Sequence, residues 1–169
     1  MVVRRLAHLM AYYLSKERNE DVVGSYRRYQ QYLRERQDSF PPGAFALGTS
    51  EWWQLPHDHR CPHDGWLESV SISEPAAGDR GEERITAIRV RLLGAYHDGH
   101  IELFYPRVFS YQLQSPSCVR GLGDWLYDEF TLSPDGRIIH EIEWAGFSDD
   151  EASRWIIEAS DIEFQWIPK

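Results

Sequence analysis

The chain has 169 residues, a formal net charge of −9 and 14% aromatic residues. This length predicts a single domain whose hydrophobic core is large enough to fold without disulfide bonds or a structural metal ion. The acidic balance argues against nucleic acid or an anionic membrane as the main partner, because both require a basic surface. It favours a protein partner that is basic or neutral. Two cysteines are too few for a disulfide scaffold, so we expect a cytoplasmic protein.

Two helices are predicted at the N-terminal end, as a helical pair over residues 1–40. From Val3 to about Lys16, apolar residues recur at helical spacing along one face. A second pattern of the same kind runs from about Val22 to Arg36. The prolines in "SFPPG" end it, because neither can continue a helix. We expect the two helices to pack on the rest of the chain as a hairpin.

From Trp66 onward the hydrophobic period changes to two, which predicts an antiparallel β core over residues 64–168. Eight segments carry this pattern: WLESVSIS, ITAIRVRLLG, HIELFY, RVFSYQLQ, DWLYDEFTL, RIIHEIEW, WIIEAS and IEFQWI. The connections are too short for helical crossovers. The sequence therefore predicts an α+β, mainly β domain. We expect an antiparallel meander or Greek-key sandwich, or a partly open barrel, of 7–8 strands with the helical hairpin packed on it.

Three of the predicted strands open with Asp-Gly, a pair that suits a tight turn. "HDGWLES" and "HDGHIEL", 34 positions apart, match at His, Asp, Gly and Glu. We therefore expect His63 and His97 to have the same structural role, in which each flanks a turn.

The stretch "HDHRCPHDGW" contains four alternating residues that could ligate a metal: His57, His59, Cys61 and His63. An extended backbone would place them on one side, and imidazole and thiolate suit zinc. Zinc signatures, however, pair two ligands at close spacing with two more at a defined distance, and no second pair is present. A zinc site and a polar turn without a cofactor both stay open, and we favour the turn.

Carboxylates lie on or beside several predicted strands. Asp128 facing Glu141 across the sheet would supply an acid and a base, but a solvated sheet face is the interpretation that we favour for such residues. His140 shares a face with isoleucines, which favours a hydrogen-bonded core residue. No nucleophile elbow, phosphate-binding glycine loop or dinucleotide fingerprint is present. We therefore assign no catalytic residue and expect a protein that is not an enzyme.

The phrases "HDGWLESVSI", "LLGAYHDGHIELFYPRVFSYQL", "DWLYDEFTLSPDGRIIHEIEW" and "WIIEASDIEFQW" resemble small uncharacterised bacterial domains. They are also similar to acidic β-rich immunity proteins, which neutralise a toxin made by the same or a neighbouring cell. The likeness covers roughly His63 to Trp166. It implies no activity and no catalytic residues.

We predict an acidic cytoplasmic binding protein, an immunity-type inhibitor of a protein partner. The predicted contact surface is Trp125, Tyr127 and Glu129, which alternate along one strand, because aromatic anchors within a polar rim carry most interface energy. For the two aromatic residues, a place in the core is the competing interpretation. The alternative function is a small-molecule-binding protein or a hydrolase, with or without a metal. Its site would lie in the mouth of the barrel, with His97, His100 and His140 near it.

Overall fold

The computed structural model describes residues 11–14, 16–146 and 152–169. Its helices are α1 (Val22–Glu35) and α2 (Pro42–Thr49), with short 3-10 turns η1 (Lys16–Asn19), η2 (Gln37–Ser39) and η3 (Glu51–Gln54). Its strands are β1 (Trp66–Ser73), β2 (Thr86–Leu93), β3 (Gly99–Gln114), β4 (Trp125–Leu132), β5 (Ile138–Trp144), β6 (Ser153–Ala159) and β7 (Glu163–Pro168). The predicted fold class, mainly β with antiparallel strands and two helices near the N-terminus, is confirmed.

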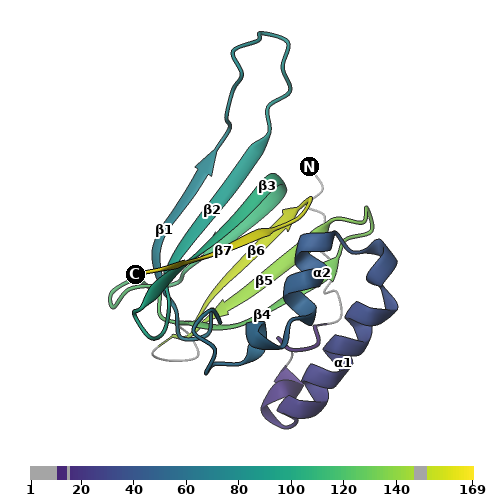
Figure 1. Cartoon of the computed structure of the whole chain (residues 1–169), viewed down its shortest axis with the longest axis vertical. Coiled ribbons are helices and arrows are strands. Elements are labelled where there is room, and N and C mark those ends of the chain that lie inside the picture. The colour runs from purple at the N-terminus through teal and green to yellow at the C-terminus, as the bar shows by residue number, and fades with distance from the viewer. Residues whose placement is uncertain (1–10, 15, 147–151) are drawn as a thin grey trace.

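The seven strands form one antiparallel sheet in the order β1-β2-β3-β6-β5-β4, and β7 pairs with β3 (Figure 1). β6 and β7 both pair with the long strand β3. β6 pairs with its residues Val108 to Gln114, and β7 pairs with its residues Gly99 to Phe104. Two of the eight predicted strands therefore merge into β3. The merger is possible because Pro106 lies in the gap between these two ladders and opposite a bulge in the pairing with β2, where its missing N–H costs no ladder bond.

The two edge strands of the sheet, β1 and β4, meet at one end only. The main-chain N–H of Asp64 donates to the carbonyl of Trp125 at 2.8 Å, and the N–H of Trp125 donates to Gly65 at 3.0 Å. Trp66 and Asp124 form an isolated antiparallel bridge beside these bonds. The strands thus form one open sheet, in place of the two sheets of a sandwich, and its edges are clasped at this end by main-chain hydrogen bonds.

Both helices lie on one face of the sheet, on the side of β4 and β5 (Figure 1). α2 begins at Pro42, which suits a first helical position because its missing N–H has no helical partner there. The next two amides, of Gly43 and Ala44, donate to the carboxylate of Asp161 at 3.0 and 2.9 Å. The prolines that end one helix therefore begin another. No helix in the described part of the chain is long and apolar enough to cross a membrane.

The two predicted N-terminal helices are found in part. The helix expected from about Val22 to Arg36 is α1. Of the helix expected from Val3 to about Lys16, residues 3–10 and 15 lie outside the described residues, and residues 11–14 are not helical. The reason is that the amides of residues 12–14 donate to a side chain of β4 instead of to helical carbonyls. Among the described residues, the other α-helix, α2, lies beyond residue 40, where the sequence pattern predicted none.

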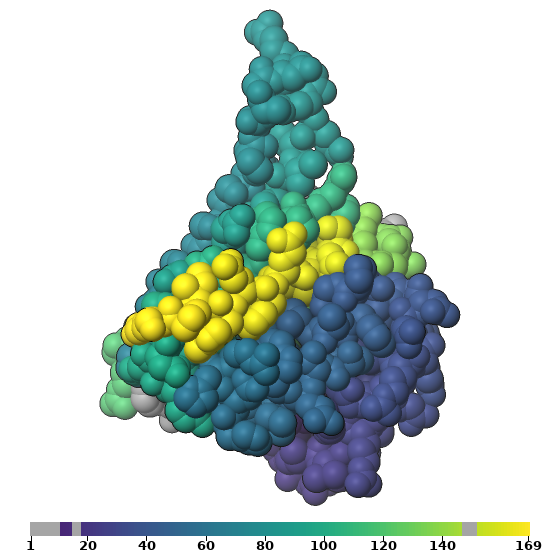
Figure 2. All heavy atoms as spheres, in the orientation of Figure 1, coloured from purple at the N-terminus to yellow at the C-terminus, as the bar shows by residue number. Residues whose placement is uncertain are grey.

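The connection between β1 and β2 projects beyond the body of the protein as a hairpin arm, residues 74–86 (Figures 1 and 2). Every residue from Ser71 to Gly81 is exposed. The core lies instead between the helices and the opposite end of the sheet, where Tyr29, Leu33, Trp53, Leu103 and Phe130 are completely or almost completely buried.

Candidate functional site

The stretch "HDHRCPHDGW" forms the clasp between β1 and β4. It consists of consecutive turns: Asp58 N–H donates to Leu55 O, Cys61 N–H to Asp58 O, and Gly65 N–H to Pro62 O. Asp64 takes a left-handed backbone conformation, with φ of 62°. In the second His-Asp-Gly copy, His97 takes this conformation, with φ of 59°. Both copies therefore form turns, but the strained position is shifted by one residue.

The turns separate the four residues considered as zinc ligands. His59 Nδ1 lies 2.5 Å from Asp98 Oδ2, whereas the Cys61 thiol donates to the carbonyl of Trp53 at 3.1 Å. His63 packs edge-on against Tyr127, and His57 is exposed. Across residues 11–14, 16–146 and 152–169, no three His, Cys, Asp or Glu side chains are grouped to hold a metal ion. The extended backbone assumed for these four residues is not what forms.

Burial determines the chemistry of the one cysteine in this clasp. Cys61 is 2% exposed, and burial raises the pKa of its thiol to about 12. Because the thiolate is the reactive form, Cys61 is a poor nucleophile and a poor metal ligand near neutral pH.

A cluster of exposed aromatic and histidine side chains lies where the clasp contacts the loop between β2 and β3. We name it the Trp66 patch: His59, Trp66, Tyr96, His97 and Asp98. The rings of His59 and Tyr96 stack at 4.0 Å, and the ring of His97 meets that of Trp66 edge-on at 4.8 Å. The Tyr96 hydroxyl donates to Pro56 O at 3.3 Å. Trp66 is nevertheless 52% exposed and Tyr96 49% exposed.

A groove of about 570 Å³ adjoins the patch at Trp66 and Leu67. Its other lining residues are Arg120, Gly121, Leu122, Gly123, Asp124, Ala145 and Gly146. Burial, together with the nearby Asp64 carboxylate, raises the pKa of Asp124. The half-exposed indole of Trp66 therefore stands at the border of a concave surface.

The three residues expected to form a contact surface on β4 do not share one exposed face. A bulge between Trp125 and Tyr127 breaks the alternation, and both Trp125 and Glu129 are 1% exposed. Tyr127 is half-buried. Of the other predicted binding residues, His97 belongs to the Trp66 patch. His100 is largely buried, with Nε2 3.3 Å from Glu68.

Trp125 belongs to a buried polar chain. The indole N–H groups of Trp53 and Trp125 donate to the two carboxylate oxygens of Asp128, at 2.9 and 3.2 Å. His140 Nε2 lies 3.0 Å from the same carboxylate, and His140 Nδ1 lies 2.7 Å from the Tyr105 hydroxyl. Asp128, His140 and Tyr105 are all at most 2% exposed, and the contacts among them occupy their polar atoms. This arrangement is structural, as expected for His140.

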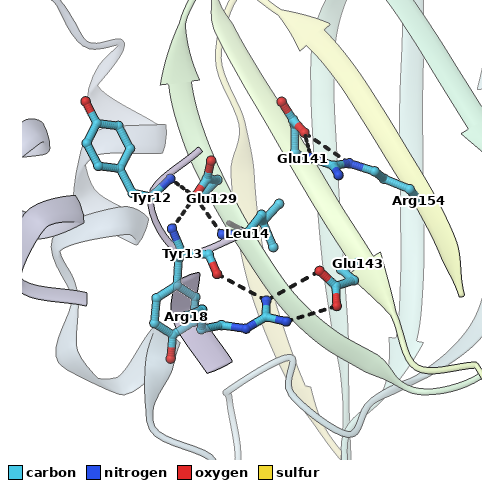
Figure 3. A network of polar contacts seen from close by, with 8 residues as sticks. All are labelled: Tyr12, Tyr13, Leu14, Arg18, Glu129, Glu141, Glu143 and Arg154. Carbon is cyan, nitrogen blue, oxygen red and sulfur yellow. Dashed lines mark hydrogen bonds and ion pairs between the residues drawn. The ribbon is translucent and has the colours of Figure 1, made fainter. Parts of the chain in front are cut away.

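The strand register also decides which carboxylates face one another. Glu129, not Asp128, lies opposite Glu141 across β4 and β5. Glu141 is paired with Arg154 of β6. Glu129 accepts the main-chain N–H groups of Tyr12, Tyr13 and Leu14 on a single oxygen, at 3.1, 2.7 and 3.1 Å (Figure 3).

Arg18 fixes the same N-terminal segment a few residues later. Its guanidinium donates to the carbonyl of Tyr13 and pairs with Glu143 at 3.2 Å (Figure 3). It also lies 4.2 Å from the centre of the Tyr127 ring. Glu129 and Glu143 thus hold residues 12–14 and 16–18, which we name the strap, against β4 and β5. No period in the sequence signals this role, because it depends on strands more than 100 residues away.

Comparison with known proteins adds no relative: no family model, no curated protein and no solved structure matches the chain.

Proposed function

We propose that the chain is a binding protein for a protein partner, an immunity-type inhibitor that acts through the Trp66 patch. The observation that carries the proposal is the half-exposed Trp66 ring, which contacts His97 edge-on and borders a concave surface. Tryptophan and tyrosine are enriched among residues that dominate binding energy, and they act best next to pockets that exclude water. Exposure of two large rings in one cluster is otherwise unfavourable.

The patch is held rigid before any partner arrives. His59 is fixed by its contacts with Asp98 and Tyr96, and the clasp is fixed by the main-chain bonds between Asp64 and Trp125. A preorganised surface loses little side-chain and loop entropy on binding. This rigidity supports a stable contact made with few conformational changes.

Net charge indicates the chemistry of the partner. A chain of net charge −9 associates fastest with a basic protein, because complementary potentials steer the encounter. Proteins that act on nucleic acids carry such basic surfaces. Together with the likeness of residues 63–166 to immunity proteins, this supports a basic toxin as the partner, neutralised in the bacterial cytoplasm.

Site-specific photo-crosslinking in the cell that encodes the chain tests the proposal. A benzophenone side chain placed at Tyr96 should capture one protein, whereas the same group at the exposed Gln31 of α1 should not. The captured protein, or a toxin encoded beside the chain, is then purified and its affinity for the wild-type chain is measured by calorimetry.

Substitution separates the patch from other exposed aromatics. Trp66→Ala should weaken partner binding about 30-fold or more, the magnitude of a dominant interface residue. Tyr111→Ala is the matched control, because Tyr111 is 45% exposed on the distant part of β3. Equal affinities for wild type and Trp66→Ala, or capture from Gln31 alone, would overturn the proposal. Loss of growth protection by Trp66→Ala in cells expressing the partner would support inhibition.

A further inference from the structure

A second concave site is lined by residues of both the clasp and the strap. It is a cavity of about 120 Å³. Its lining residues are Tyr13, Trp53, Gln54, Pro56, Cys61, Pro62, His63, Trp125, Leu126, Tyr127 and Asp128. None of them belongs to the Trp66 patch. Tyr13 comes from the strap, so the segment anchored by Glu129 supplies one wall.

Two polar atoms of this lining are buried without a hydrogen-bond partner: Gln54 Nε2 and His63 Nδ1. His63 Nδ1 is 3.1 Å from Asp64 Oδ1, but the direction does not make a hydrogen bond. Buried polar atoms are almost always paired in folded proteins, and leaving them unpaired is costly. Two such atoms around one cavity indicate a site that a polar molecule completes.

The other lining groups define what that molecule is. The Asp128 carboxylate already receives three N–H groups, from Trp53, Trp125 and His140, and the Cys61 thiol is protonated. Neither supplies a free charge, so the site favours a neutral ligand. The aromatic rings and prolines of the wall favour a flat one. A cavity of about 150 Å³ is known to hold benzene, so one six-membered ring is the appropriate size.

We infer that this cavity binds a small, neutral, planar ring that carries a carbonyl oxygen as hydrogen-bond acceptor. The amide of Gln54 donates to this oxygen, and so does His63 Nδ1–H, in the tautomer that the nearby Asp64 carboxylate favours. A cyclic amide, whose C=O is attached to the ring and can accept two hydrogen bonds, meets both requirements. The cavity shares no residue with the Trp66 patch, although Pro56 of its lining accepts a hydrogen bond from Tyr96 of the patch.

Titration of the full chain with 2-pyridone tests the inference, with benzene as a probe of equal ring size that lacks polar groups. In ¹⁵N-resolved NMR spectra, 2-pyridone should produce saturable shifts of the indole N–H signals of Trp53 and Trp125. Benzene should bind at least tenfold more weakly. Gln54→Met, which keeps the side-chain length but removes the donor, should weaken 2-pyridone binding at least tenfold, and Gln31→Met on exposed α1 should not.

Gln54→Met should also unfold at a higher denaturant concentration than wild type, because it removes an unpaired buried donor. His63→Phe provides a second variant that removes the ring nitrogens and should lose 2-pyridone binding as well. The inference is wrong if 2-pyridone gives no saturable shift with wild type, if benzene binds equally well, or if both variants bind like wild type. Partner capture through Tyr96 should be unchanged by Gln54→Met, which separates this result from the proposed function.

Discussion

The phenolic oxygen of Tyr29 accepts a hydrogen bond of 2.6 Å from the main-chain N–H of Phe130. One turn further along α1, the hydroxyl of Tyr32 accepts the N–H of Leu132 at 2.9 Å. These two amides lie on the outer edge of β4, where no other described strand pairs with it. An edge strand with free N–H groups is a template for unwanted pairing. The helix therefore protects this edge with side-chain oxygens, and α1 is fixed in register with β4.

Tyr29→Phe should lower the free energy of unfolding by about 1–3 kcal/mol, because it leaves the buried N–H of Phe130 unpaired. Tyr32→Phe is the matched control. Tyr32 is only half-buried, so water can replace its hydroxyl and the loss should be smaller. Urea unfolding followed by tryptophan fluorescence gives both values, and equal losses would contradict this account of the edge.

Asp128→Ala should destabilise the fold by about 3–5 kcal/mol. It removes the shared acceptor of Trp53, Trp125 and His140, and all three groups are buried. Asp135→Ala, in the exposed turn between β4 and β5, should change stability by less than about 0.5 kcal/mol. A loss below about 1 kcal/mol for Asp128→Ala in urea unfolding would show that water replaces the carboxylate in this chain of contacts.

Glu129 should make the stability of the fold depend on pH. Burial raises the pKa of its carboxyl above the ordinary value of 4.5, the three strap amides lower it, and Glu141 opposite raises it. On balance the folded state binds this proton more tightly than the unfolded state. The contribution of Glu129 is therefore complete below the unfolded pKa and is lost as pH rises through the raised folded pKa.

The comparison of wild type with Glu129→Gln measures this effect. The stability of wild type relative to the variant should be greatest near pH 4 and should fall as the pH rises toward 7. Glu163→Gln, at an exposed position of β7, is the control, with differences within about 0.5 kcal/mol throughout. A difference that grows in favour of wild type with rising pH would show that the strap amides outweigh burial.

The two cysteines should differ sharply in thiol chemistry. Burial raises the pKa of Cys61 to about 12, whereas Cys118 is exposed. A disulfide reagent at pH 8 should therefore modify one thiol rapidly and the second only after denaturant is added. Cys118→Ser should remove the rapid reaction. Rapid modification of that variant would mean that the clasp around Cys61 opens frequently in the native state.

Removal of the arm should leave the fold intact. Replacing residues 74–86 with Asn-Gly joins Ser73 to Ala87, which are paired across β1 and β2, through a two-residue turn. The replacement breaks the exposed ion pair between Glu83 of the arm and Arg107 of β3, and such pairs contribute about 0–1 kcal/mol. Calorimetry should show a melting temperature within a few degrees of wild type. A large decrease would show that the arm stabilises the sheet.

Sequence patterns were sufficient where the physical cause is local. Ile88, Val90 and Leu92 alternate with arginines and are completely buried, so the inner face of β2 follows directly from the period of two. The helix α1 follows from the spacing of its apolar residues in the same way. For the candidate site, the sequence indicated His97 but not Trp66 or Tyr96. Exposed aromatic residues have the same alternation signal as buried ones, and only the position of a covering layer distinguishes them.

The amino-acid sequence by itself determined the strands, most of their inward faces, the acidic charge and the turns at Asp-Gly, because these depend on residues a few positions apart. The tertiary structure alone decided that "HDHRCPHDGW" is a clasp and that Glu129 holds a strap 115 to 117 residues away in sequence. It also decided that the Asp128 carboxylate contacts the indole N–H groups of two tryptophans and the ring of a histidine. Such contacts arise only when the sheet curls and brings distant segments together, and no local period encodes that approach.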